Sequence, residues 1–190
     1  MTPEETLKIT TEYLKNLQAM KTHYVAVGLP AGKTGNKTHD DGTSIIEIGA
    51  VHEFGADIDH PGGTGYMATG GKATFSKNSF MGPVSGFTAA HKITIPERSF
   101  LRAPFTLKKS EINRAIEKAV ESVGSGRHDA TTALYLIGAV ARNISVKAFE
   151  TAGYGTWPDI KAATKKAKGS SAPLIDTGAL RAAITWEISK

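Results

Sequence analysis

The segment Ile48-Gly49-Ala50-Val51-His52-Glu53-Phe54-Gly55 is the most informative stretch of this chain. Together with the apolar Ile45 it predicts a helix over residues 45–54, for which Thr43 or Ser44 supplies the cap and Gly55 the stop. Two later blocks accompany it: Ile95-Pro96-Glu97-Arg98-Ser99-Phe100-Leu101-Arg102, and Pro173-Leu174-Ile175-Asp176-Thr177-Gly178-Ala179-Leu180-Arg181. Each block is short, so the information lies in their combination and order.

Between the first two blocks lies a glycine-rich segment, residues 57–95, which carries scattered aromatic residues. A structureless loop of this length is uncommon inside a compact domain, so the segment predicts a projecting β-hairpin arm. An isolated two-stranded ribbon is marginal in water, and we therefore expect the arm to pack on a neighbouring subunit. The expected interface residues are Tyr66, Phe75, Phe80 and Phe87, with Arg98 and Arg102 where the arm meets the body.

The rest of the chain predicts helices around a small sheet. Thr2, Pro3 and Glu5 form a capping-box pattern, and the stripe of Ile9, Tyr13, Leu17 and Met20 that follows should dock this first helix on a sheet. Further expected elements are a buried strand over 24–29, a mobile loop over 31–42, a helix capped by Ser110 that stops at Gly124, a helix over 129–150, and a closing strand over 184–188.

Length and composition indicate one cytoplasmically made domain, residues 1–190, of α+β class: a small antiparallel or mixed sheet packed against helices, with the long projecting arm. The chain has no cysteine, which excludes disulfides and thiol chemistry. The acidic start lacks a signal-peptide pattern and no apolar run is long enough for a membrane span, so we expect no membrane partner.

The formal net charge of +5 is concentrated in one short segment that contains Lys161, Lys165, Lys166 and Lys168. The plain interpretation is a solvated loop or helix end. The alternative is a nucleic-acid-binding module that uses residues 161–168, because clustered lysines neutralise phosphates. Loss of binding with rising salt would distinguish such a module from an apolar assembly surface.

His52 and Glu53 invite comparison with a zinc-protease helix, but Ala56 stands where the second histidine ligand would be needed. No nucleophile with its base and no pair of catalytic carboxylates is identifiable, so we expect no enzymatic activity, no metal and no cofactor. Arg98 and Arg102 are four residues apart, which in a helical turn would place both on one face. Glu97, Glu53 or an aspartate of a neighbouring subunit could then supply the carboxylate that a buried or interfacial arginine prefers.

The three blocks, in their order, resemble a family of neck and tail-completion proteins of tailed bacteriophages. The resemblance covers about two-thirds of the chain. It implies a structural virion protein, made in the host cytoplasm, that forms or completes a ring, expected to be hexameric, which closes the tail end. The implied partners are copies of itself, the head-side connector, the tail terminator or tail tube protein, and DNA passing through the lumen. The insertion over 57–95 is longer than the connection expected for the family.

Overall fold

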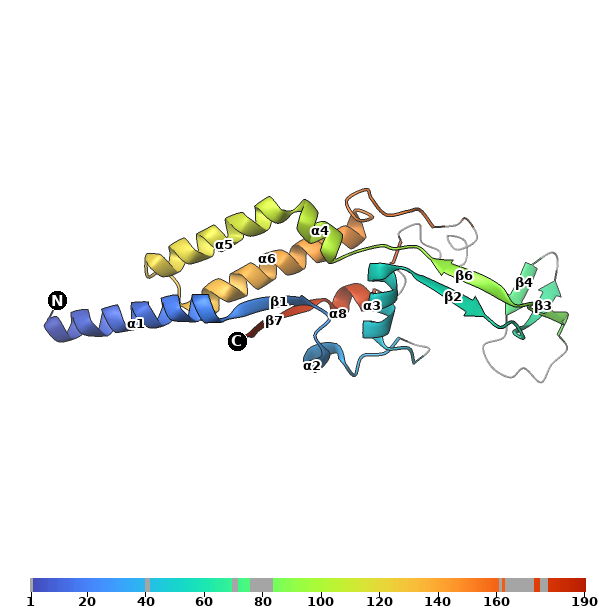
Figure 1. Ribbon diagram of the computed structural model, residues 1–190, viewed down its shortest axis with the longest axis horizontal. Helices are drawn as coiled ribbons and strands as arrows, with labels where there is room; N and C mark the ends of the chain where they lie inside the picture. The colour runs from blue at the N-terminus through green and yellow to red at the C-terminus, as the bar shows by residue number, and fades with distance from the viewer. Residues whose placement is uncertain are drawn as a thin grey trace.

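The computed structural model describes residues 2–39, 42–69, 72–75, 84–160, 162, 173–174 and 178–190. It is an elongated α+β molecule with a helical body at one end and a β-ribbon arm at the other (Figure 1). The fold class expected from the sequence is confirmed.

Three helices form most of the body: α1 (Pro3–Thr22), α5 (Lys109–Gly124) and α6 (Ala130–Glu150). The capping box of α1 is confirmed, with Thr2 and Glu5 bonded reciprocally. The expectation that α1 docks on a sheet is wrong, because its Leu17 and Met20 pack instead on α5 and α6. The reason is that a two-stranded sheet has too little surface for a further helix, whereas α5 and α6 leave a small apolar cluster to cover.

A two-stranded antiparallel sheet joins β1 (Tyr24–Gly28) to β7 (Thr185–Ser189), with Tyr24 opposite Ser189. Both expected strands are confirmed, although β1 is only partly buried. The sheet lies on α6, where the Trp186 ring occupies the space over Gly138: a Cβ at Gly138 would come within 2.2 Å of that ring. Arg142 Nε also donates to the Ile184 carbonyl at 2.8 Å, which ties α6 to the strand.

The expectation of a mobile loop over 31–42 is wrong for its first part. Residues Ala31–Thr34 form a short helix, α2, whose Thr34 side chain is buried and donates to the Pro30 carbonyl at 2.7 Å. Lys33 Nζ donates to the Trp186 carbonyl at 2.6 Å. The local bond of Thr34 and the bond of Lys33 to β7 order a segment whose composition alone suggests a loop.

Helix α3 (Ile45–Phe54) follows and has the expected bounds. Ser44 occupies the N-cap position without a side-chain hydrogen bond, and Gly55 ends the helix with φ of 73°. Glycine is suited to this stop because the left-handed region is strained for residues that carry a Cβ.

One helix after the arm begins slightly earlier than expected. Helix α4 (Arg102–Leu107) leads almost directly into α5, whose N-cap is Lys108 and not Ser110. The chain is already helical before Ser110, so its hydroxyl does not stand at a boundary. Helix α6 begins as expected, with Asp129 Oδ1 accepting from the Thr132 amide at 2.7 Å.

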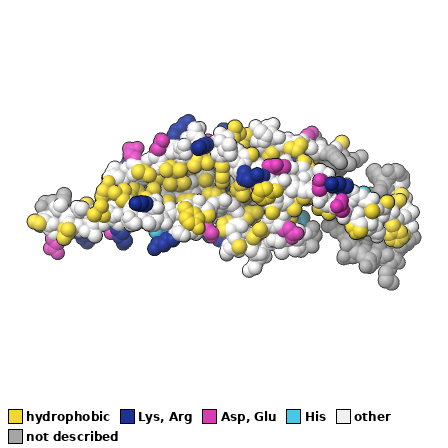
Figure 2. Space-filling view, viewed as in Figure 1, with side chains coloured by type: hydrophobic (Ala, Val, Ile, Leu, Met, Phe, Trp, Pro, Cys, Tyr) yellow, Lys and Arg dark blue, Asp and Glu magenta, His cyan; other side chains and the backbone are white. Residues whose placement is uncertain are grey.

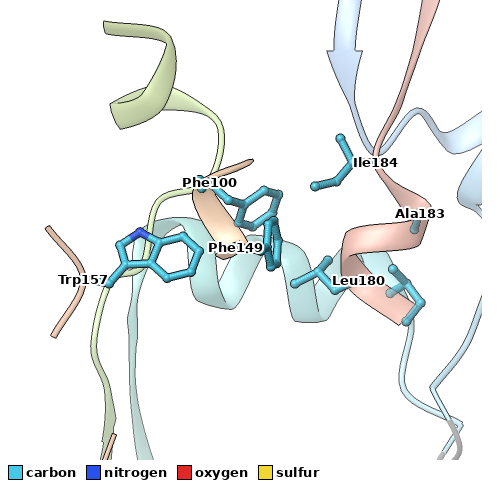
Figure 3. Packing of buried hydrophobic residues seen from close by; sticks show 8 residues of the cluster. Phe100, Phe149, Trp157, Leu180, Ala183 and Ile184 are labelled. Carbon is cyan, nitrogen blue, oxygen red and sulfur yellow. The ribbon is translucent and has the colours of Figure 1, made fainter. Parts of the chain in front are cut away.

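The main hydrophobic core lies where α3, α6, the short helix α8 (Ala179–Ala183) and the chain after the arm converge (Figure 3). Phe100 is only 1% exposed and its ring centroid lies 5.3 Å from that of Phe149. Trp157 meets Phe149 edge-on at 5.6 Å. Leu180 and Ile184 complete the cluster from the C-terminal side.

The predicted arm is present and projects away from the body (Figure 1). Its stem pairs β2 (Ala56–His60) antiparallel with β6 (His91–Ile95). Its tip is a three-stranded sheet in the order β4-β3-β5, formed by β3 (Gly65–Thr69), β4 (Lys72–Phe75) and β5 (Gly86–Phe87). The arm is therefore a ribbon that widens at its tip.

Truncation of Phe100 to Ala should destabilise the protein by roughly 3–5 kcal/mol, because the ring is fully buried against Phe149 and its removal leaves a cavity. Thermal or denaturant unfolding followed by circular dichroism measures the loss. Phe87→Ala is the matched control, since that ring is 66% exposed at the arm tip. Equal stability of the two variants would contradict the assignment of Phe100 to the core.

The pH dependence of the free energy of unfolding should contain a contribution from Asp129, the N-cap residue of α6. Its pKa is lowered, first by the hydrogen bond from the Thr132 amide, so the cap stabilises fully above the ordinary aspartate pKa and is lost as pH falls through the lower folded-state value. Asp129→Ala should cost about 1 kcal/mol at neutral pH. Asp129→Asn keeps a capping oxygen and should remove only this part of the acid dependence. Denaturant titrations from neutral to acid pH provide the measurement, and an unchanged profile in Asp129→Asn would refute the assignment.

Candidate assembly site

The Glu53 carboxylate organises the junction between arm and body. Glu53 is 4% exposed, at the end of α3, and its two oxygens accept from the Ser99 hydroxyl at 2.7 Å and the Phe100 amide at 2.7 Å. They also accept from the amides of Leu101 at 3.0 Å and Arg102 at 2.9 Å. One carboxylate thus binds the donors of four successive residues.

This arrangement has a simple physical cause. The chain leaves the arm and enters α4 at Arg102, so the amides before and at that helix start have no intrahelical acceptor. A carboxylate at a helix N-terminus satisfies them and also interacts favourably with the helix dipole. Here the carboxylate comes from the distant helix α3, so the cap joins two segments separated by the whole arm.

Arg102 completes the junction. Its Nε lies 3.2 Å from a Glu53 oxygen, and its Nη2 donates to the Glu53 carbonyl at 2.8 Å and to the Glu97 carboxylate at 2.9 Å. Its guanidinium carbon lies 4.3 Å from the centroid of the Phe54 ring. The expected carboxylate partners are therefore confirmed for Arg102, which remains about half exposed.

Arg98 takes a different position. It is 7% exposed and donates to the carbonyls of Pro158, at 3.2 Å from Nη2, and Asp159, at 3.5 Å. Burial lowers the pKa of Arg98, and the charge of Asp159 opposes that effect. The expectation that Arg98 and Arg102 share a helical face is wrong, because the helix begins only at Arg102. A subunit contact through Arg98 stays a prediction.

The segment after α6 closes the junction from the other side. Trp157 Nε1 donates to the Ser99 carbonyl at 2.9 Å, and Ser145 Oγ donates to the Phe100 carbonyl at 2.8 Å. The backbone of this turn therefore has partners for both its amides and its carbonyls. The base of the arm is held rigidly against the core.

The arm tip brings together three of the predicted interface aromatics. Tyr66 lies opposite Phe75 in the β3–β4 pair, with ring centroids 6.2 Å apart, and Phe87 lies opposite Gly65 in the β3–β5 pair. Phe75 is 58% exposed and Phe87 is 66% exposed. Phe80 lies outside the described residues. The tip thus presents apolar rings to solvent, far along the molecule from Arg98 and Arg102.

The stem of the arm also exposes apolar surface. Ile58 lies directly opposite Ile93 in the β2–β6 register, and both remain exposed. Around them, Lys92 Nζ lies 3.3 Å from Asp57, and the His60 and His91 rings stack with centroids 4.9 Å apart. The register is therefore fixed by side-chain pairs as well as by backbone bonds.

Some predicted residues lie outside the described part of the chain. These are Lys161, Lys165, Lys166 and Lys168, so a nucleic-acid surface over 161–168 stays a prediction. Among the described residues, no group of histidines and carboxylates is placed to hold a metal ion. Within the same ranges, no helix is long and apolar enough to cross a membrane.

The sequence predicts no exposed apolar surface on α5 and α6, and on α1 it places Ile9 and Tyr13 on a docking face although both are exposed. Figure 2 shows hydrophobic side chains gathered in a band over α5 and α6. Their spacing on α6, where apolar residues surround the helix, was a signal that could have revealed them. The exposed members on the three long helices are Leu7, Ile9, Tyr13, Leu14, Ile116, Val120, Tyr135 and Leu136.

Comparison with protein-family models, with curated proteins and with solved structures gave no match.

Replacement of Glu53 by Gln should destabilise the protein by roughly 2–4 kcal/mol, because the neutral amide cannot accept from all the donors of the 99–102 turn. The measurement is the free energy of unfolding in urea. Glu97→Gln is the matched control: its carboxylate meets Arg102 on an exposed face and should contribute less than about 1 kcal/mol. A loss no larger in Glu53→Gln than in the control would argue against the central role of Glu53.

Proposed function

We propose that this protein is a structural subunit of a phage neck, which assembles with copies of itself into a ring that closes the tail end and joins it to the head-side connector. The observation that carries the proposal is the arm. It presents Phe75 and Phe87 to solvent at its tip, where both rings remain more than half exposed.

An arm of this kind suits assembly on physical grounds. Exposed aromatic rings at the end of a ribbon are the residues enriched at protein interfaces. A monomer would gain nothing from holding them in water, whereas a neighbouring subunit that covers them removes apolar surface from solvent. The rigid junction at Glu53 supports this role, since it fixes the direction in which the arm points.

The elongated shape favours contacts between unlike surfaces. Because the arm tip and the helical body lie at opposite ends (Figure 1), the tip of one subunit can meet the body of the next. Such heterologous contacts generate rings when the rotation closes. A closed ring agrees with the resemblance of this chain's sequence blocks to neck proteins. The same resemblance implies a tail terminator or tail tube protein as a partner, and DNA in the lumen of the ring.

The chemistry at His52 and Glu53 also favours a structural role. The Glu53 carboxylate accepts hydrogen bonds from Ser99, Phe100, Leu101 and Arg102, so it is not available as a general base. Substitution of Glu53 would disturb the fold, and activity loss in such a variant could not be attributed to catalysis.

Replacement of residues 62–90 by a short turn should leave a folded monomer. His60 and His91 are paired across the stem, so a loop of Pro61 and two added residues can close it. The described residues of the removed segment contribute nothing to the two core clusters. Circular dichroism and thermal unfolding measure the fold, and sedimentation equilibrium measures the mass. An unfolded product would contradict the arm as a separate assembly element.

The full-length control is Phe75→Ser with Phe87→Ser, which keeps the arm and removes only its exposed rings. In a phage that carries this gene, both variants should yield free heads and tails that fail to join. Normal plaque formation by either variant would overturn the proposed role of the arm.

A further inference from the structure

The outer side of the α5–α6 pair contains a groove of about 590 Å³. Its floor is apolar and its rim is charged, which is the construction of grooves that receive amphipathic helices. The floor residues are Ala115, Ala119, Leu136 and Val140, and the charged residues on the rim are Glu111, Arg114, Lys118, Glu121 and Arg127.

The rim has a small positive excess, because three basic residues stand against the two acidic residues Glu111 and Glu121. Arg127 pairs with Glu121 at 3.2 Å, so these two charges neutralise each other. Arg114 and Lys118 lie one helical turn apart on α5, both exposed, and within the described part of the chain neither forms an ion pair. An occupant with acidic side chains beside apolar ones would match this groove.

The first part of α1, residues 3–14 and called its N-terminal half from here on, has that composition. Leu7 is 68% exposed and Leu14 is 59% exposed, and their spacing of seven places them on one side of the helix, two turns apart. The acidic residues of this half are Glu4, Glu5 and Glu12, against the single basic residue Lys8. The capping box holds the helix start in order, with Thr2 N bonded to Glu5 Oε2 at 2.6 Å.

This half-helix cannot reach the groove of its own chain. The second half of α1 is fixed against α5 and α6 by Leu17 and Met20, and Asn16 accepts from the Ala130 amide at 3.0 Å. Because α1 is one continuous helix, its first half continues away past the ends of α5 and α6 (Figure 1). A groove that it fills must belong to another molecule.

We propose that the N-terminal half of α1 docks in the α5–α6 groove of a second copy of this chain, with Leu7 and Leu14 on the Leu136 and Val140 floor. Glu4, three residues before Leu7 and on the same side of α1, then lies beside Lys118. The proposal rests on the ring assembly proposed above and names a second contact within it. The two surfaces differ, so the contact is heterologous and each copy is both donor and acceptor.

Cysteine cross-linking tests the proposal, since the natural chain has no cysteine. Leu7→Cys and Leu136→Cys are made separately, mixed at high concentration and oxidised. A disulfide-linked dimer should form in the mixture and not in either variant alone. Leu107→Cys, exposed on α4 outside the groove, replaces Leu136→Cys in the control mixture.

Two results would overturn the docking. One is a dimer from Leu7→Cys alone, which would show α1 pairing with α1. The other is a yield from the Leu7→Cys and Leu136→Cys mixture no greater than from the Leu107→Cys control. A Leu7→Asp, Leu14→Asp variant should keep the melting temperature, because both side chains are exposed, and should lose self-association.

Charge reversal provides an independent measurement. Lys118→Glu should weaken association on the order of tenfold, and Glu4→Lys in the same chain should restore it, because every copy carries both partners. Absence of this rescue overturns the pairing. Oligomers of unchanged mass without the cross-link would leave the ring proposal standing and reject the groove. If the cross-link forms and the arm-deleted chain still assembles fully, the groove contact stands and the proposed role of the arm is rejected.

Discussion

The carboxylate of Glu53 is the interaction on which the rest of the structure depends. It binds the amides of Phe100, Leu101 and Arg102 at the point where the chain returns from the arm. That single cap fixes Phe100 in the core, starts α4 and sets the base of the ribbon. The position of Phe100, the start of α4 and the base of the ribbon are coupled. Residues 99–102 carry the hydrogen-bond donors, the buried ring and the exit from the arm.

Apolar side chains are closely packed in the core of this protein, but many others remain exposed on its surface. Around Phe149, rings and aliphatic side chains from separate parts of the chain interlock with almost no exposure (Figure 3). On α1, α5, α6 and the arm, side chains of the same chemical types remain in water. The proposed contacts between copies rest on these exposed apolar residues, which lie on both the helical body and the arm.

The sequence predicted the elements whose signals are local. The capping box at Thr2 and Glu5, the stop at Gly55 and the arm over 57–95 depend on neighbouring residues, and all three are present. The docking of α1 and the order in α2 depend on distant partners such as Trp186, which no local pattern reveals. At the junction, the carboxylate partner of Arg102 was predictable from chemistry. The carbonyl partners of Arg98 were not, because they lie some sixty residues further along the chain.

Both tryptophans of the chain belong to the body. Trp157 closes the junction over the Ser99 carbonyl, and Trp186 lies against Gly138 of α6 beside the Tyr135 ring. The arm has none. Intrinsic tryptophan emission therefore reports on the seating of the arm base and on the small sheet, while it is blind to the arm tip. A tryptophan introduced at the tip would give the two ends of the molecule separate optical signals.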